Sequence, residues 1–217
     1  VKIAMPQFNL DQEEKWKNNN RQKITDLNFK EINNAIEQNY ELIVLPETAF
    51  PFSLTQKKDI YERLISKSKD ISILTGSLHK KNNQYFNASY LFEDGKVHIA
   101  HKTVLVPFGE AVPFPEMIRN LINDIFYDGA KDYAVASNPT TFTIQNTKFR
   151  NAICYEATTD KVFENIDTAY MIAISNNAWF TPSTQAALQK QLLKYYAKKY
   201  NAIIFHSSNG TPNAIIY

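Results

Sequence analysis

The chain has 217 residues, of which 44% are hydrophobic and 21% charged, and its formal net charge is +2. This length and composition favour one domain with a full hydrophobic core. The small net charge, with acids and bases interspersed, argues against a nucleic-acid-binding protein. No run of eighteen apolar residues occurs, so no segment of this sequence is predicted to span a bilayer. Because the sequence begins with Val1 and stops inside an apolar run at Tyr217, we expect it to be a piece of a longer chain.

The first predicted elements follow the order strand, helix, strand. Residues 1–5 favour a strand, and residues 11–38 carry apolar side chains spaced mostly by three and four, which predicts one long amphipathic helix. Residues 41–45 predict a short buried strand that Pro46 ends, so that Glu47 lies at the mouth of the strand. This order is typical of an α/β sandwich.

A second helix and a third strand are expected over residues 55–69 and 71–78. Gly76 lies in this strand at a position where we expect only a small residue to fit. The Asp-Gly pair at 94–95 predicts a β-hairpin, and the second strand of this hairpin brings Lys102 to its end.

The segment after this hairpin is dense in proline. Residues 105–115 contain three prolines without periodicity, which predicts a rigid loop that carries Glu110. Residues 117–126 repeat apolar side chains at helical spacing and predict a short helix. Its apolar face would pack on the core or contact a lipid, and the sequence leaves both possibilities open.

A second hairpin is predicted from strands at residues 140–144 and 148–153, and it ends at Cys154. The remaining predicted elements are a buried strand at 169–175, a loop at 176–180 and a helix at 181–199 that begins at Thr181 and Pro182. Two final strands are predicted at 202–206 and 213–217.

Cys154 is the only cysteine, so it cannot form a disulfide within this chain. A cysteine on a strand is ordinarily a small buried hydrophobe, but here the pattern turns polar, and Glu156 would point the same way if the strand continued. With Glu47 and Lys102 at other strand ends, the chain has an acid, an ammonium and a thiol that suffice for acyl transfer through a thioester. Spacing alone is a weak signal, because charged residues at strand ends are ordinarily just solvated.

Four ordered segments resemble the signatures of the nitrilase (carbon–nitrogen hydrolase) superfamily, and most closely those of its apolipoprotein N-acyltransferase branch. The pattern Leu-Val-Pro-Phe-Gly-Glu-x-Val-Pro is particular to that branch, whereas the Glu, Lys and Cys are general to the superfamily. The resemblance covers nearly the whole chain, since Gln7 and the Asn-Gly pair at 209–210 also match. The four segments are residues 45–51, 102–113, 153–156 and 175–180.

The resemblance implies a catalytic role for five residues. Glu47 matches the general base, Lys102 the lysine that stabilises the oxyanion, and Cys154 the nucleophile. Glu110 matches a second acid that assists the lysine and the reacting groups. Glu156 belongs to the pair that follows the nucleophile.

Three further residues are expected to bind substrate. Tyr155 would offer its backbone N–H to the oxyanion. Trp179 matches an aromatic side chain in a loop that lines the pocket, although plain packing is an equal alternative. Phe108 is expected in an apolar lid that keeps water from the thioester, together with Phe50, Phe52, Phe114 and residues 117–126.

The fold implied by the resemblance is α/β, a nitrilase-like α-β-β-α sandwich of two mixed sheets with helices on the outer faces. Residues 1–217 are expected to form a single catalytic domain of this kind. The implied reaction moves a fatty acyl group from a phospholipid, through a Cys154 thioester, to the α-amino group of the lipidated N-terminal cysteine of a lipoprotein.

The expected partners are therefore a phospholipid acyl donor, a lipoprotein acceptor and, through flanking segments, a membrane surface. No cofactor, metal or nucleic acid is expected. The implied location is the bacterial inner membrane, with the catalytic domain on the periplasmic side.

The chain also departs from the family pattern. Members of this branch carry membrane helices on both sides of the catalytic domain, and we expect this chain to be the extramembrane part or a shortened relative. The family pattern has further strands after the position of Tyr217, and we expect this sequence to stop before them. Asn177 stands where an aspartate is common, which affects the expected details of the substrate loop but not the three main catalytic residues.

Three alternatives remain at this stage. A soluble nitrilase-type amidase would use the same Glu, Lys and Cys on a small carbon–nitrogen substrate. A papain-like pair of Cys154 and His206 fits poorly, because the cysteine lies at a strand end and not at a helix start. An inactive lipid-binding or scaffold domain would keep the motifs without the chemistry.

Overall fold

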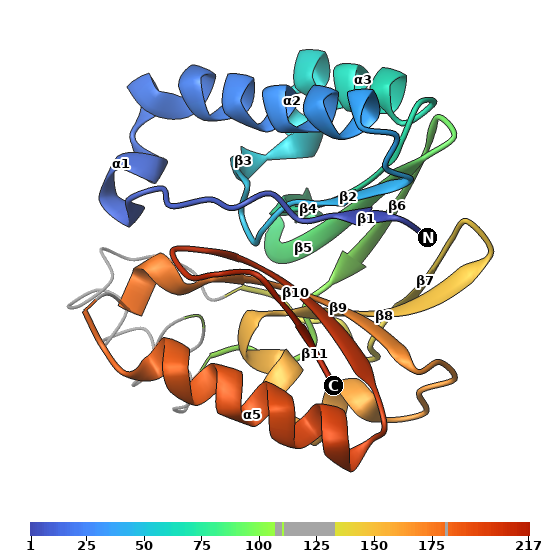
Figure 1. Ribbon diagram of the computed structural model, residues 1–217. Helices are drawn as coiled ribbons and strands as arrows, with labels where there is room; N and C mark the ends of the chain where they lie inside the picture. The colour runs from blue at the N-terminus through green and yellow to red at the C-terminus, as the bar shows by residue number, and fades with distance from the viewer. Residues whose placement is uncertain (107–109, 111–132, 181) are drawn as a thin grey trace.

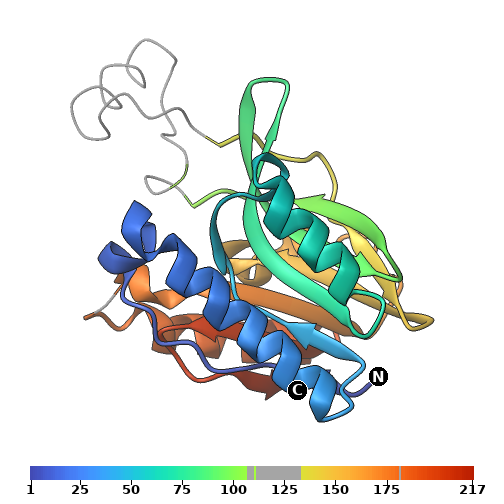
Figure 2. The same ribbon diagram turned by 90° about the horizontal axis from the view of Figure 1, so that it is seen from above.

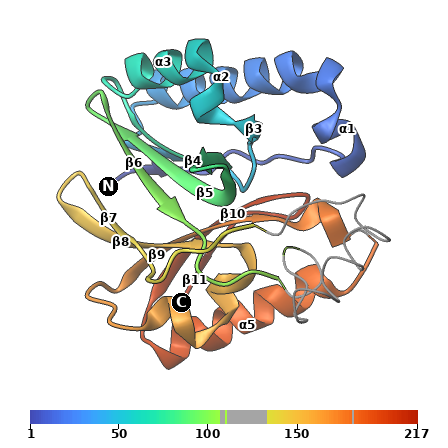
Figure 3. The same cartoon turned by 180° about the vertical axis from the view of Figure 1, so that it is seen from behind.

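Two β-sheets face each other between layers of helices (Figure 1). The structure is a computed structural model that describes residues 1–106, 110, 133–180 and 182–217. Helices α2 (Arg21–Glu37) and α3 (Lys58–Lys67) lie side by side over the first sheet, as Figure 2 shows from above. Helix α5 (Gln185–Lys199) covers the second sheet on the opposite side of the molecule (Figure 3).

The first sheet is mixed, with the strand order β1-β2-β4-β5-β6 and β3 pairing with β4. Strands β1, β2 and β4 are parallel, whereas β4, β5 and β6 form an antiparallel meander. The turn between β5 and β6 contains the predicted Asp-Gly pair. The strands are β1 (Ile3–Ala4), β2 (Leu42–Val44), β3 (Phe50–Ser53), β4 (Ser72–Lys81), β5 (Gln84–Glu93) and β6 (Lys96–His101).

The second sheet is also mixed and has the order β11-β10-β9-β8-β7. The three inner strands are parallel and the two outer strands are antiparallel to their neighbours. The predicted α-β-β-α sandwich of two mixed sheets is therefore confirmed. The strands are β7 (Thr141–Ile144), β8 (Thr147–Ile153), β9 (Tyr170–Asn176), β10 (Ile203–Asn209) and β11 (Ala214–Ile216).

The single long helix predicted over residues 11–38 is wrong. Helix α1 (Gln12–Trp16) begins after Asp11, whose carboxylate accepts the N–H groups of two residues in the first turn. The backbone is extended at Lys17, with φ −66° and ψ 132°, and this ends α1. A 3₁₀ turn of three asparagines, η1 (Asn18–Asn20), then leads into α2. Asparagine is a poor helix former, so the helix breaks for a local reason that the spacing of the apolar residues does not indicate.

Strand β3 was not predicted, because its sequence contains Pro51. It pairs with β4 through an irregular register between Phe50 and Ser53. Phe50 and Phe52 are 0% and 7% exposed, and the ring of Phe50 lies 6.2 Å from that of Phe29 on α2. These two phenylalanines therefore belong to the core, and their predicted place in a lid is wrong.

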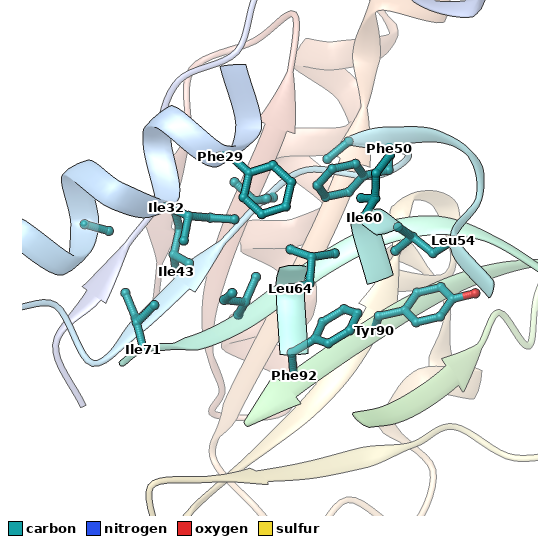
Figure 4. Close-up of a cluster of buried hydrophobic side chains, with 14 of the residues drawn as sticks. Phe29, Ile32, Ile43, Phe50, Leu54, Ile60, Leu64, Ile71, Tyr90 and Phe92 are labelled. Carbon is teal, nitrogen blue, oxygen red and sulfur yellow. The ribbon is translucent and has the colours of Figure 1, made fainter. Parts of the chain in front are cut away.

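Three groups of buried apolar side chains hold the layers together. The first lies between α2, α3 and the first sheet, around Phe29 and Leu64 (Figure 4). The second lies between the two sheets and includes Val44 and Ile174. The third joins α5 to the second sheet and includes Leu193. The described helices and strands that contribute to these groups thus bury apolar side chains against a neighbouring layer.

The second half of the chain contains several short 3₁₀ segments beside its strands. Helix α5 begins at Gln185, four residues after the predicted start at Thr181. The predicted helix at 117–126 lies outside the described residues. Within the described part of the chain, no helix is both long enough and apolar enough to cross a membrane. The 3₁₀ segments besides η1 are η2 (Leu54–Gln56), η3 (Cys154–Thr158), η4 (Asp160–Phe163) and η5 (Asn177–Phe180).

Candidate active site

Glu47 lies in the turn between β2 and β3, and both of these strands pair with β4. The backbone of this turn passes close over Gly76, where an added Cβ would lie 2.7 Å from the Cα of Glu47 and 2.6 Å from the backbone N of Thr48. Thr48 has a positive φ of 49°, a conformation that costs energy for a β-branched residue. The predicted need for a small residue at Gly76 is therefore confirmed, and its reason is the approach of the Glu47 turn.

Lys102 follows the last residue of β6 and is fully buried. Its Nζ lies 2.6 Å from Oε2 of Glu110 and 3.9 Å from Oε1 of Glu47. Asn87, in the middle of β5, donates from Nδ2 to one oxygen of each carboxylate, at 2.8 Å in both cases. The structure thus brings Glu47, Lys102 and Glu110 together around one asparagine side chain.

Cys154 follows β8, where the chain turns from strand into η3. Its φ is +54°, so the backbone leaves the strand direction at the cysteine itself. The side chain is 5% exposed. Burial raises the pKa of the Cys154 thiol to about 12, and of the nearby charges Glu47 raises this pKa further whereas Lys102 lowers it. The thiol therefore lies in the electrostatic field of both groups.

The charges at this cluster suit proton transfer from sulfur to a carboxylate. Burial raises the pKa of Glu47, although Lys102 opposes this effect. Burial alone would lower the pKa of Lys102, but Glu47 and Glu110 together raise it, so the lysine is held as an ammonium. Lys102 supplies one positive charge for two carboxylates, so one carboxylate remains available to accept a proton. Glu47 is the acceptor whose proton affinity is raised, so it is suited to take a proton from the thiol.

Glu156 lies in η3, so the continued strand that would align it with Cys154 does not form. Its Oε2 accepts the backbone N–H of Ile153 at 2.8 Å, and its Oε1 accepts the hydroxyl of Thr103 at 2.7 Å. Burial raises the pKa of Glu156 to about 7, and its hydrogen bond from Thr103 opposes this shift. Its contacts tie the turn that carries Cys154 to the segment that follows Lys102.

The three predicted substrate-binding residues have different surroundings. Tyr155 is 39% exposed, next to the nucleophile in η3. Trp179 is 60% exposed in η5, so its ring is not part of the described core. Phe108, Phe114 and residues 117–126 lie outside the described residues.

Sequence reasoning missed Asn87 and Lys15. Asn87 lies within β5 and belongs to none of the sequence motifs. Lys15 is 1% exposed on α1, and its Nζ donates to the carbonyl of Glu47 at 3.2 Å and to Oγ1 of Thr48 at 2.9 Å. Burial lowers the pKa of Lys15 to about 7, against the influence of Glu47. A lysine in a polar segment ordinarily indicates a solvated face, so no sequence signal distinguishes this one.

His206 is buried on β10, and its Nε2 forms a hydrogen bond with Oγ of Ser175 at 2.9 Å. Burial lowers the pKa of His206 to about 4, so the imidazole is neutral. The papain-like pairing of this histidine with Cys154 receives no support from these contacts. Among the residues that the structure describes, no group of three or more His, Cys, Asp or Glu side chains is arranged to hold a metal ion.

Residues 2–205 match the carbon–nitrogen hydrolase family, so the chain belongs to that family. Among its relatives is an apolipoprotein N-acyltransferase of Wolinella succinogenes, which is 41% identical over 99% of this chain and 52% of that protein. An apolipoprotein N-acyltransferase of Campylobacter jejuni is 36% identical over 96% of this chain and 46% of that protein. The predicted family resemblance is confirmed, and the chain spans about half the length of these relatives.

The fold agrees with solved structures of the same superfamily. A CN-hydrolase superfamily protein from Xanthomonas campestris matches all of this chain and 79% of its own length, with a TM-score of 0.71 and 15% sequence identity. At this level of identity the likeness supports the fold alone.

Proposed function

We propose that the chain is the catalytic part of an apolipoprotein N-acyltransferase. The observation that carries the proposal is the convergence of Glu47, Lys102 and Glu110 on the region of a single buried thiol, in a chain whose relatives include proteins of that name at 41% and 36% identity. The acyl donor is a phospholipid, and the acceptor is the α-amino group of a lipoprotein's diacylglyceryl cysteine. The reaction takes place at the periplasmic face of the bacterial inner membrane.

In the first half-reaction, Sγ of Cys154 attacks the ester carbonyl of the phospholipid while Glu47 takes the thiol proton. A carbon–sulfur bond forms, and the carbonyl oxygen becomes an oxyanion that the ammonium of Lys102 and the backbone N–H of Tyr155 stabilise. The ester carbon–oxygen bond then breaks, and the leaving alkoxide takes the proton from Glu47. The products are a lysophospholipid and an acyl thioester on Cys154.

In the second half-reaction, the amine of the lipoprotein attacks the thioester carbonyl. Glu47 accepts a proton from the attacking nitrogen, and the carbon–sulfur bond breaks to give an amide and a thiolate. The thiolate then recovers a proton from Glu47. Glu110 and Asn87 position Glu47 and Lys102 through the contacts described above, and Glu156 holds the turn that carries the nucleophile.

The proposal is tested by following the mass of the protein. The protein is mixed with a phospholipid whose acyl chain carries an isotope label, and we expect Cys154 to gain the mass of that chain. A peptide with a diacylglyceryl cysteine and a free α-amino group should then remove the adduct and become N-acylated. Cys154→Ala and an acceptor with an acetylated α-amino group are the controls.

Three outcomes would contradict the proposal. A folded protein that gains no adduct favours an inactive lipid-binding domain. An adduct that water removes as fast as the amine does favours a hydrolase. Turnover of small amides without any reaction with phospholipid favours a soluble nitrilase-type amidase.

A further inference from the structure

A glutamine on α5 lies against the sulfur of the nucleophile. Gln189 is 4% exposed, whereas its neighbour Leu188 is 61% exposed. It begins a buried stripe that continues at Leu193 and Ala197, each four residues further along the helix. The other members of this stripe are apolar and pack on the second sheet. Burying an amide costs free energy unless its polar atoms form hydrogen bonds, so the hydrogen bonds of Gln189 must account for its buried position.

The hydrogen bonds of the Gln189 amide show which end faces Cys154. Asn177 donates from Nδ2 to Oε1 of Gln189 at 2.9 Å, so Oε1 faces Asn177. The amide Nε2 therefore points the other way, where it donates to Oγ of Ser175 at 3.2 Å and to Sγ of Cys154 at 3.9 Å.

A second hydrogen bond behind Ser175 holds this arrangement. Oγ of Ser175 accepts from Gln189 and also lies 2.9 Å from Nε2 of His206, with which it forms a second hydrogen bond. Ser175, His206 and Gln189 are 0%, 4% and 4% exposed, so water does not compete for these bonds. The amide of Gln189 has two N–H groups, so one of them remains for the sulfur when the other is donated to Ser175.

We propose that Gln189 is a further catalytic residue, whose side-chain amide donates a hydrogen bond to the sulfur of Cys154 and stabilises its thiolate, and that Asn177, Ser175 and His206 position this amide. The inference rests on the proposed function for its role in acyl transfer, but the contact itself concerns only the thiol. No bond to Gln189 forms or breaks. The amide acts when the thiol loses its proton to Glu47 and again when the amine expels the thiolate from the thioester.

The backbone N–H of Asn176 also donates to this sulfur, so the thiolate has two neutral donors besides the charge of Lys102. A hydrogen bond to a charged acceptor is stronger than one to a neutral acceptor. Gln189 therefore favours the thiolate over the thiol, and its removal should lower the rate of every step in which the sulfur bears charge. The expected loss is about 10- to 100-fold.

The first test measures the thiol without any lipid. The rate of alkylation of Cys154 by iodoacetamide is followed against pH in the intact protein and in Gln189→Met, which keeps the length of the side chain and removes the donor. At each pH between 7 and 9 we expect alkylation to be about 10- to 100-fold slower in this variant, because the pKa of the thiol rises and less thiolate is present. Gln189→Glu should slow it further, because a carboxylate would face the thiolate.

The matched control is Gln191→Met, which changes an exposed glutamine two residues along the same helix. Its alkylation profile should equal that of the unchanged protein, and circular dichroism checks the fold of each variant. A folded Gln189→Met or Gln189→Glu protein with an unchanged profile overturns the proposal, even if acyl transfer is slower. A shifted profile in a protein that gains no acyl adduct from phospholipid instead supports the role of Gln189 and rejects the proposed function.

Discussion

The side chain of Asn87 links the two acidic residues of the candidate active site. Its side chain donates one hydrogen bond to Glu47 and one to Glu110, and its backbone carbonyl accepts the N–H of Lys102. An amide is suited to this place because it offers two N–H groups and adds no charge to a cluster that already contains two carboxylates. The hydrogen bond from Asn87 therefore influences how readily Glu47 accepts a proton.

Replacing Asn87 by aspartate keeps the shape of the side chain and adds a third negative charge. The pKa of Glu47, which burial already raises, should rise further because like charges disfavour the ionised form. The acid limb of the pH–rate profile of acyl transfer should move to higher pH by about one pH unit or more. The check is the profile between pH 5 and 9, with Asn83→Asp in an exposed hairpin turn as the control. An unmoved acid limb with a lower maximum would instead indicate damage to positioning.

The principal site residues could be predicted from the sequence because each stands in a motif at the end of a predicted strand. Glu47 follows Pro46, Lys102 ends a hairpin and Cys154 is the only thiol. Asn87 and Lys15 could not, because their importance comes from contacts with Glu47 across the fold and not from their neighbours in the sequence. The end of the strand at Cys154 could not be predicted either, since nothing local indicated the positive φ of this residue.

At the scale of the secondary structure elements, the turn between β2 and β3 positions the general base of the proposed reaction. The turn can pass close over β4 only because Gly76 has no side chain. On its other side the turn contacts Lys15 of α1, which donates to the Glu47 carbonyl. A strand and a helix thus hold the backbone of Glu47 from two directions.

Gly76→Ala should displace this turn. The added methyl would lie 2.6 Å from the backbone N of Thr48 and 2.9 Å from the carbonyl oxygen of Pro46, which are backbone atoms that cannot rotate away. We expect a loss of stability of about 1–3 kcal/mol and a fall in acyl transfer of about 100-fold, because small displacements of catalytic groups are costly.

The measurements are urea unfolding and initial rates at one pH. Ser89→Ala is the control, since Ser89 faces Gly76 across the β4–β5 pair and loses an atom instead of gaining one. Equal rates in Gly76→Ala and the unchanged protein would show that Glu47 tolerates the displacement.

The elements that were predicted well have a clear local cause. The hairpin of β5 and β6 follows from an Asp-Gly pair, in which both residues have positive φ. The errors have local causes as well, in the extended backbone at Lys17 and the proline within β3. Spacing of apolar residues continues across such a break, so a periodic pattern predicts the burial of residues 11–38 but not the break.

At the scale of the whole molecule, buried ionisable groups make the folded state sensitive to pH. Lys15 is one such group outside the catalytic cluster, since burial lowers its pKa from 10.5 to about 7. Between these two values the unfolded chain holds a proton at this lysine that the folded protein has lost. The free energy of unfolding should therefore rise with pH over that range.

Lys15→Met should remove this part of the pH dependence. Relative to the variant, the unchanged protein should gain at most about 1.4 kcal/mol of stability per pH unit between pH 7 and 10.5. Urea unfolding of both proteins at several pH values between pH 7 and 10 measures the difference. Lys30→Met, at an exposed position on α2, removes the same formal charge without contact to the Glu47 turn and serves as the control. Parallel curves for Lys15→Met and the unchanged protein would contradict the expectation.

The exposed ring of Trp179 gives the molecule an optical signal of its own. This indole lies in η5, directly after the strand whose last residue, Asn176, contacts the nucleophile. Indole fluorescence shifts to shorter wavelength when hydrocarbon replaces water around the ring. The other tryptophan, Trp16, is half-buried on α1 and provides a second emission to compare. If the proposed acyl transfer brings an acyl chain beside η5, its arrival is therefore observable in real time, without attaching a dye.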